Sequence, residues 1–265
     1  IGERGAVVST VRLEGTRAIP VVILDRTAAR NAIDCEMAAD LHRILRALAD
    51  DPELRALVLT GEGGRAFCAG ADLVERGGMT PAERGAHTEA IGAVADAIAA
   101  SPVPVIAAIR GYALAGGAEL ALAADVRIAA NDAVFGLPEV RIGIFPGAGG
   151  VVRLPRLIGS GAARDLLFTG RQVGADEALR LGLVDRVVPP GTTLATAVEL
   201  AERIAANAPL AVRALKSALR ESNGLPETEA LDVVARRRRP LDGTEDYAEG
   251  LRAFIEKRAP RFSGH

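Results

Sequence analysis

Two glutamates lie in stretches that are otherwise nearly free of charge, and they are the first candidates for chemistry. Glu119 follows a Gly-Gly pair in GYALAGGAEL, residues 111–120, and Glu139 follows a proline in FGLPEVRIGIFPGAGG, residues 135–150. A carboxylate in apolar surroundings needs a partner or a function. Burial and a neighbouring like charge both raise the pKa of a carboxyl group, so two glutamates beside one water molecule can act as an acid and a base.

Each glutamate also has a purely structural interpretation. Glu119 is favourably placed near the start of a helix, which stabilises an exposed acid by about 1 kcal/mol at most. Glu139 could be a carboxylate at a strand end that pairs with Arg141. Taken singly, each glutamate supports the structural and the catalytic interpretation equally well.

Two loops of small residues add a second chemical element. AFCAGADL, residues 66–73, and GYALAGG, residues 111–117, both precede a predicted helix start, where backbone N–H groups are free to face an anion. We expect Ala69 and Gly116 to donate hydrogen bonds to a carbonyl oxygen on which negative charge develops. A single glycine loop more often only permits a tight turn. The two nearby acids favour the functional interpretation.

The elements that must position these residues alternate between strand and helix. Strands are expected at 6–13, 18–24, 55–60, 103–109, 124–130 and around Phe135. Helices are expected from Asp34, from Thr80 to Ala100, and from Thr192 to the end of the chain, where Thr244 caps the last one. This order predicts an α/β fold with parallel strand pairing, in which ligands bind at the carboxyl ends of the strands.

Composition narrows the class of protein. The 265 residues are 49% hydrophobic and 25% charged, with a net charge of -2, which is typical of a globular protein and argues against a nucleic-acid coat or an anionic membrane as partner. No apolar run is long enough for a membrane span. Cys35 and Cys68 are too few for a disulfide framework, so we expect a reducing, cytoplasmic location. The chain begins with Ile1, which leaves a removed targeting segment open.

Several long segments, in order, resemble the enoyl-CoA hydratase or crotonase family over nearly the whole chain. These segments are AFCAGADL, IRGYALAGGAELALAADVRIA, FGLPEVRIGIFPGAGG, RLPRLIG, GRQVGADEALRLGLVDRVV and AFIEKRAPRF. The resemblance implies a crotonase-like spiral of ββα units. Residues 1–190 would form the α/β core with the active site. Residues 191–265 would form a C-terminal helical region that serves oligomerisation and completes the acyl-CoA pocket, in a homotrimer or a homohexamer.

Motif matching then implies roles for individual residues. Ala69 and Gly116 match the oxyanion-hole donors, Glu119 and Glu139 match the pair that holds and activates water, and Gly147 matches a backbone position that helps to hold that water. Contacts with the coenzyme A portion are implied for Gly70, Ala71, Asp72, Leu73, Phe254 and Lys257, the last two often from a neighbouring subunit. Ala115 stands where the family commonly has a glycine, a change that adds only a methyl group. DRTAARNAID also departs from the family pattern, which leaves the contributions of Arg30 and Ala32 to coenzyme A binding open.

The implied reaction adds water across the 2,3 double bond of a 2-enoyl-CoA thioester to give 3-hydroxyacyl-CoA. Coenzyme A is then part of the substrate, and no cofactor or metal is expected. The alternatives are a methylglutaconyl-CoA hydratase, suggested by ADLVERGGM, an enoyl-CoA isomerase, which needs only one carboxylate, and an acyl-CoA-binding scaffold without activity.

Other polar residues favour structural interpretations. The run RRRR at 236–239 lacks an aromatic stacking platform, which favours a solvated helix end or a subunit contact over RNA binding. Cys68 is expected to be a small buried thiol rather than a nucleophile. Three scattered histidines lack a nucleophilic partner in their motifs and receive no catalytic role: His42, His87 and His265.

Overall fold

The strands form two sheets in the computed structural model, which describes residues 10–265. A six-stranded sheet has the order β1, β2, β3, β5, β7, β10. Its strands are β1 Val11–Gly15, β2 Pro20–Leu24, β3 Leu57–Gly61, β5 Val105–Ile109, β7 Val126–Ala130 and β10 Arg186–Val188. A four-stranded sheet contains β4 Ala66–Cys68, β6 Tyr112–Leu114, β8 Val134–Gly136 and β9 Gln172–Gly174, in that order. The part of the predicted strand 6–13 that precedes residue 10 lies outside the described residues.

The chain alternates between the two sheets as it advances. β3, β5 and β7 lie side by side in the large sheet and are parallel, and the strands that follow them, β4, β6 and β8, are parallel neighbours in the small sheet. Helices come after each pair of strands. The antiparallel pairs are β1 with β2 and β8 with β9. This arrangement confirms the predicted α/β fold, a spiral of ββα units.

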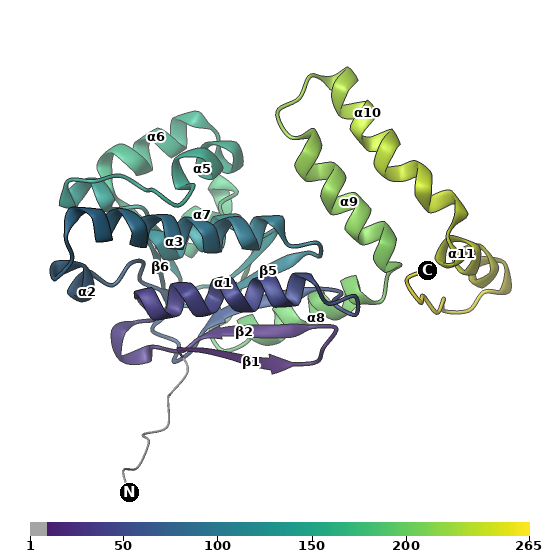
Figure 1. Ribbon diagram of the computed structural model, residues 1–265, viewed down its shortest axis with the longest axis horizontal. Coiled ribbons are helices and arrows are strands. Elements are labelled where there is room, and N and C mark those ends of the chain that lie inside the picture. Colours follow the sequence, from purple (N-terminus) through teal and green to yellow (C-terminus); the bar gives the residue numbers. More distant parts are fainter. Residues whose placement is uncertain (1–9) are drawn as a thin grey trace, which may run out of the picture.

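Helices cover the sheets, and several begin at the predicted caps (Figure 1). Asp34 accepts a hydrogen bond from the N–H of Met37 at the start of α1, and Thr80 forms a capping box with Glu83 at the start of α3. The α-helices that precede the C-terminal region are α1 Cys35–Ala49, α2 Leu73–Gly77, α3 Pro81–Ala100, α4 Gly116–Ala123, α5 Gly150–Ile158, α6 Ser160–Thr169 and α7 Ala175–Leu181. The described part of the chain also contains three short 3-10 helices: η1 Thr27–Ala29, η2 Glu139–Ile142 and η3 Arg239–Gly243.

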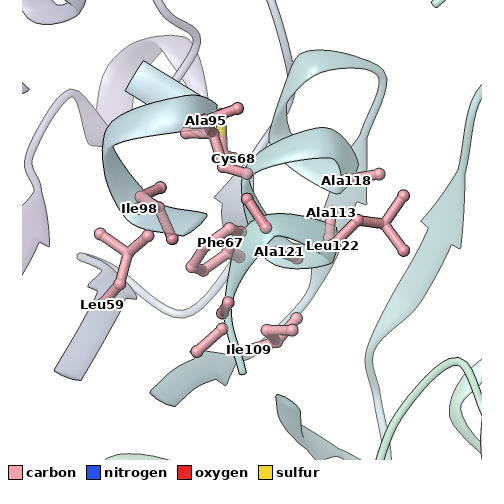
Figure 2. Packing of buried hydrophobic residues seen from close by; sticks show 14 of the residues in the cluster. Leu59, Phe67, Cys68, Ala95, Ile98, Ile109, Ala113, Ala118, Ala121 and Leu122 are labelled. Carbon is pink, nitrogen blue, oxygen red and sulfur yellow. The ribbon is translucent and has the colours of Figure 1, made fainter. Parts of the chain in front are cut away.

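Aliphatic side chains and alanines make up most of the core, as the scarcity of aromatic residues predicts. Figure 2 shows Phe67 of β4 among Leu59, Ile98 and Ile109, with the small side chains of α4, such as Ala121, on its other side. The small residues of α4 let this helix approach the β4 and β6 strands closely. The close packing fixes α4 with respect to the strand ends beneath it.

The last helices divide into a packed part and a projecting part. α8 Thr193–Ala205 packs on the large sheet, where Ala197 and Ala201 are fully buried beside Ile106 and Ile128. α9 Pro209–Ser222 and α10 Glu227–Arg238 lie side by side and project from the sheets, with α11 Glu245–Glu256 beyond them (Figure 1). α8 therefore belongs to the core, although it lies in the predicted C-terminal helical region. None of the helices in residues 10–265 is long and apolar enough to cross a membrane.

Candidate active site

Three neighbouring strands of the small sheet end at one edge, and the loops that follow them build a cavity. β4, β6 and β8 are parallel, so the chain leaves all three on the same side. The cavity has a volume of ≈ 370 Å³. Seven of the predicted site residues line it: Ala69, Ala71, Leu73, Gly116, Glu119, Glu139 and Gly147. We call this space the strand-end cavity.

Glu119 reaches the strand-end cavity from the first turn of α4 and is held by two backbone groups. The residue is 3% exposed, and its Oε1 accepts hydrogen bonds from the N–H of Ala148 at 2.8 Å and of Gly150 at 2.7 Å. Burial raises the pKa of Glu119, while these two N–H donors and the charge of Arg153 oppose the rise. Its other oxygen, Oε2, forms no hydrogen bond within the described residues and is left for a ligand.

Glu139 begins the 3-10 helix after β8 and has much poorer support for a negative charge. It is 7% exposed, and its buried Oε2 finds no hydrogen-bond partner among residues 10–265. Burial raises the pKa of Glu139 to about 7; the backbone N–H of Glu139 itself opposes the rise, and the charge of Glu119 adds to it. Within the described chain Arg141 forms no ion pair with Glu139, so the structural interpretation of this acid fails.

Glu119 and Glu139 have unequal surroundings, which favour different protonation states for the two acids. Glu119 receives two N–H donors, which favour its charged form, whereas Glu139 has an orphaned oxygen and a pKa near neutrality. A carboxylate and a carboxylic acid can therefore coexist on the wall of one cavity at neutral pH.

The loop after β4 carries a free N–H group, but not at the predicted residue. The N–H of Ala69 donates to the carbonyl oxygen of Arg30 at 3.1 Å. This hydrogen bond contradicts the prediction that Ala69 is an oxyanion donor, because its N–H is already used to hold the loop. The N–H of Ala71, two residues on, has no acceptor in the described part of the chain. The nitrogen of Ala71 lies 3.8 Å from the point where a Cβ on Gly116 would stand.

Gly116 supplies the second free N–H because it is the first residue of α4, where no intrahelical acceptor exists. The two loops meet closely at Gly70, which has a φ of +93° and would place a Cβ 2.7 Å from the Cβ of Ala115. Gly70 therefore acts by letting the loops touch. Ala115 itself has a φ of 50°, a value that favours glycine and strains an alanine.

Three other residues from the first half of the chain, predicted to contact coenzyme A, do not line the cavity and instead lie in or beside the loop that follows β4: Arg30, Ala32 and Asp72. The Asp72 carboxylate accepts hydrogen bonds from the first N–H groups of α2 and pairs with Arg26 at 2.9 Å. Ala32 is buried, and its carbonyl accepts a hydrogen bond from Arg26. The Arg30 guanidinium lies over the ring of Tyr112, 5.9 Å from its centroid.

Phe254 and Lys257 lie far from the strand-end cavity in this chain. Both are at the end of α11, and Figure 1 shows α11 at the opposite end of the molecule from α2. The Phe254 side chain is 84% exposed. The structure thus does not bring these two residues to the site within one chain, and their contact with coenzyme A stays a prediction that requires a second subunit.

Sequence reasoning missed residues that act through their backbone or through a neighbour. The GAGG run predicts Gly147 in the site, yet the groups that hold Glu119 are the N–H groups of Ala148 and Gly150. The small residues of this run were the signal that the backbone approaches another group closely. A Cβ on Gly150 would lie 3.0 Å from the Glu119 Oε1. Thr88 was also missed. Its Cγ2 would lie 2.5 Å from a Cβ on Gly147.

The remaining candidate nucleophiles and ligands do not enter the cavity. Burial raises the pKa of Cys68 to about 12, which agrees with a small buried thiol. Cys35, Glu75 and His87 offer possible metal-ligand atoms within 4.8 Å of one another. However, the Nδ1 atom of His87 accepts a hydrogen bond from the cationic Arg76, which disfavours a metal ion at this position.

Comparison with known proteins agrees with this geometry. A family model described as enoyl-CoA hydratase/isomerase matches residues 14–265. A short-chain-enoyl-CoA hydratase from Clostridium acetobutylicum is 39% identical over 250 residues, 94% of this chain and 96% of the relative. A crotonyl-CoA hydratase from Syntrophomonas wolfei is 40% identical over 250 residues, with the same coverage of 94% and 96%.

Solved structures show the same likeness in three dimensions. The crystal structure of an enoyl-CoA hydratase from Bacillus anthracis superposes with a TM-score of 0.95 at 40% identity, covering 97% of this chain and 100% of that one. Both the sequence and the fold are therefore shared over nearly the full length. The chain belongs to the enoyl-CoA hydratase/isomerase family.

Proposed function

We propose that the protein is an enoyl-CoA hydratase that adds water to a 2-enoyl-CoA thioester and forms a 3-hydroxyacyl-CoA. One observation carries the proposal: Glu119 and Glu139 line the same cavity in unequal surroundings, next to two N–H groups that no described residue uses. An isomerase needs only one of these acids. A binding scaffold needs neither acid. Since both acids are costly to bury, their presence in the cavity favours an enzyme over a scaffold.

The N–H groups of Ala71 and Gly116 are the proposed oxyanion donors. When water adds to the β-carbon, the electrons of the C=C bond move through the α-carbon onto the thioester oxygen. Two fixed N–H donors stabilise that developing charge more than they stabilise the neutral substrate. Loss of one such donor in other enzymes costs about 3 kcal/mol.

The two glutamates are the proposed proton-transfer groups, with different roles. The Glu119 carboxylate takes a proton from water, and the oxygen of that water bonds to the β-carbon. Protonated Glu139 gives its proton to the α-carbon, which completes the addition of one water molecule. Glu119 then passes its extra proton to Glu139 through solvent. Each positioned group contributes about 10²- to 10⁴-fold to the rate. Gly147, on the same wall, remains the proposed backbone position that helps to hold the water.

The chemistry uses only water and carboxyl groups, so we propose that no cofactor or metal is required and that coenzyme A enters as part of the substrate. Assembly into a homotrimer or homohexamer is supported by the projecting helices, which expose large apolar side chains: Leu215, Leu219 and Leu231. The free thiols of Cys35 and Cys68 support the proposed cytoplasmic location.

Hydration of crotonyl-CoA by the purified protein tests the proposal. The absorbance of the conjugated thioester should fall as 3-hydroxybutyryl-CoA appears. Glu119→Gln and Glu139→Gln should each lose most turnover, while a saturated acyl-CoA still binds with the parent affinity. Binding without turnover by the parent protein would favour the scaffold, and parental turnover in both variants would refute the assigned proton-transfer roles.

A further inference from the structure

Two cations, Arg76 and Arg141, lie on the wall of the strand-end cavity, and Arg76 is the less exposed of the two. Ile91, Ile142, Ile144 and Phe145 contribute large apolar side chains to the wall, and the guanidinium group of Arg76 interrupts them. Arg76 projects from the last turn of α2 and is half-buried. Removing a guanidinium group from water is costly unless a partner compensates its charge.

Two neutral groups hold this guanidinium in place. Its Nε donates to the Nδ1 of His87 at 3.2 Å, and its Nη2 donates to the Oγ1 of Thr88 at 2.8 Å. His87 is 2% exposed, and burial followed by the charge of Arg76 lowers its pKa, which keeps the imidazole neutral. Thr88 also packs against Gly147, so the guanidinium is anchored to the loop that carries the donors for Glu119.

No carboxylate within residues 10–265 forms an ion pair with Arg76, and the Nη1 of Arg76 makes no hydrogen bond there. The neighbouring acid, Glu75, accepts instead from the N–H of Cys35. Burial and then the like charge of Arg84 lower the pKa of Arg76, while Cys35 opposes this change. The site thus offers a positioned cation and two free N–H bonds on Nη1.

We propose that Arg76 selects 2-enoyl-CoA substrates whose acyl chain ends in a carboxylate, that is, monothioesters of unsaturated dicarboxylic acids. This inference rests on the proposed hydratase function and names its substrate class. A guanidinium on the wall of a small apolar cavity pairs well with a carboxylate and provides little for a hydrocarbon end. Because His87 and Thr88 preorganise the group, the ligand need not order a flexible side chain.

A phosphate of coenzyme A is the other anion that could meet Arg76. The two sources differ in a way that can be measured, because every acyl-CoA carries the phosphates whereas only some carry a terminal carboxylate. We therefore compare 4-carboxybut-2-enoyl-CoA with 5-methylhex-2-enoyl-CoA, in which an isopropyl group replaces the carboxylate at nearly the same size. The readout is kcat/KM for each substrate.

The parent protein should hydrate the carboxylate substrate with at least about a 10-fold higher kcat/KM than the isopropyl substrate. Arg76→Gln should lower kcat/KM for the carboxylate substrate by about 10- to 100-fold, the effect of one charge-assisted hydrogen bond, and leave the isopropyl substrate within about threefold. Arg76→Lys should retain part of the preference. Arg141→Gln is the matched control, because Arg141 is an exposed arginine that also lines the cavity, with its Nε beside Gly170. The Arg141→Gln variant should keep the parent's preference for the carboxylate substrate.

Equal losses on both substrates in Arg76→Gln would assign the residue to the phosphates and overturn the proposal, as would a parental preference for the isopropyl substrate. If neither substrate is hydrated, the proposed function fails while the role of Arg76 can still be tested. Calorimetry with the saturated pair, 4-carboxybutanoyl-CoA and 5-methylhexanoyl-CoA, should then show tighter binding of the carboxylate ligand that Arg76→Gln abolishes. Equal affinities of the saturated pair would overturn the role of Arg76.

Discussion

Replacing Glu139 by glutamine should make the protein more stable at alkaline pH while it destroys activity. Burial raises the pKa of Glu139 from 4.5 to about 7 in the folded protein. Folding therefore favours the protonated form of Glu139. The stability that this form contributes is complete below about pH 4.5 and is lost as the pH rises through about 7. The difference in pKa between the unfolded and the folded protein corresponds to about 3 kcal/mol in the free energy of unfolding. Glutamine stays neutral and avoids this loss.

Urea unfolding of the parent and Glu139→Gln at two pH values measures the effect. Near pH 4 the two free energies of unfolding should agree, and at about pH 8.5 the variant should be more stable by about 3 kcal/mol. The same variant should lose about 10²-fold or more in kcat. The parent rate should fall as the pH rises above about 7, because the acid is then ionised. Equal stability of the two proteins at about pH 8.5 would refute the claim that Glu139 is a buried, poorly supported carboxylate.

Three further predictions concern the groups around Glu139. Glu119→Gln should lower kcat by about 10²- to 10⁴-fold without weakening the binding of a saturated acyl-CoA, measured by calorimetry. An ester in place of the amide N–H of Ala71 should lower kcat/KM by about 10²-fold, whereas the same replacement at Ala69 should mainly weaken the loop, by about 1 kcal/mol in thermal unfolding. Ala115→Gly should raise the free energy of unfolding by about 1 kcal/mol, because its φ of 50° suits glycine, and an unchanged or lower value would contradict the strain.

Much of the fold could be predicted because local signals agree with the tertiary structure. Asp34, Thr80 and Thr244 cap the helices that they were expected to cap. Alternating strands and helices correctly predict parallel pairing. The packing of α8 on the large sheet could not be predicted from its position after Pro189 and Pro190, because the buried face of Ala197 and Ala201 becomes visible only when the sheet is present.

The acids of the site, proposed to act through their side chains, could be predicted from the sequence. The choice between neighbouring backbone N–H groups in one loop could not. Two acids in apolar sequence identify Glu119 and Glu139 as candidates. Ala69 and Ala71 are the same residue type in one short loop, and only the hydrogen bond to Arg30 shows which N–H group is used. The unpaired charge of Arg76 was equally hidden, because a sequence does not show which acids a guanidinium fails to reach.

A crystal structure with a bound, slowly reacting acyl-CoA would show whether the two N–H groups and the two glutamates converge on one substrate. The thioester oxygen should lie about 2.7 to 3.1 Å from the nitrogens of both Ala71 and Gly116. One water molecule should lie within hydrogen-bond reach of Glu119 and Glu139, beside the β-carbon. A thioester oxygen turned away from these two N–H groups, or glutamates that contact no common water or ligand, would refute the proposed mechanism.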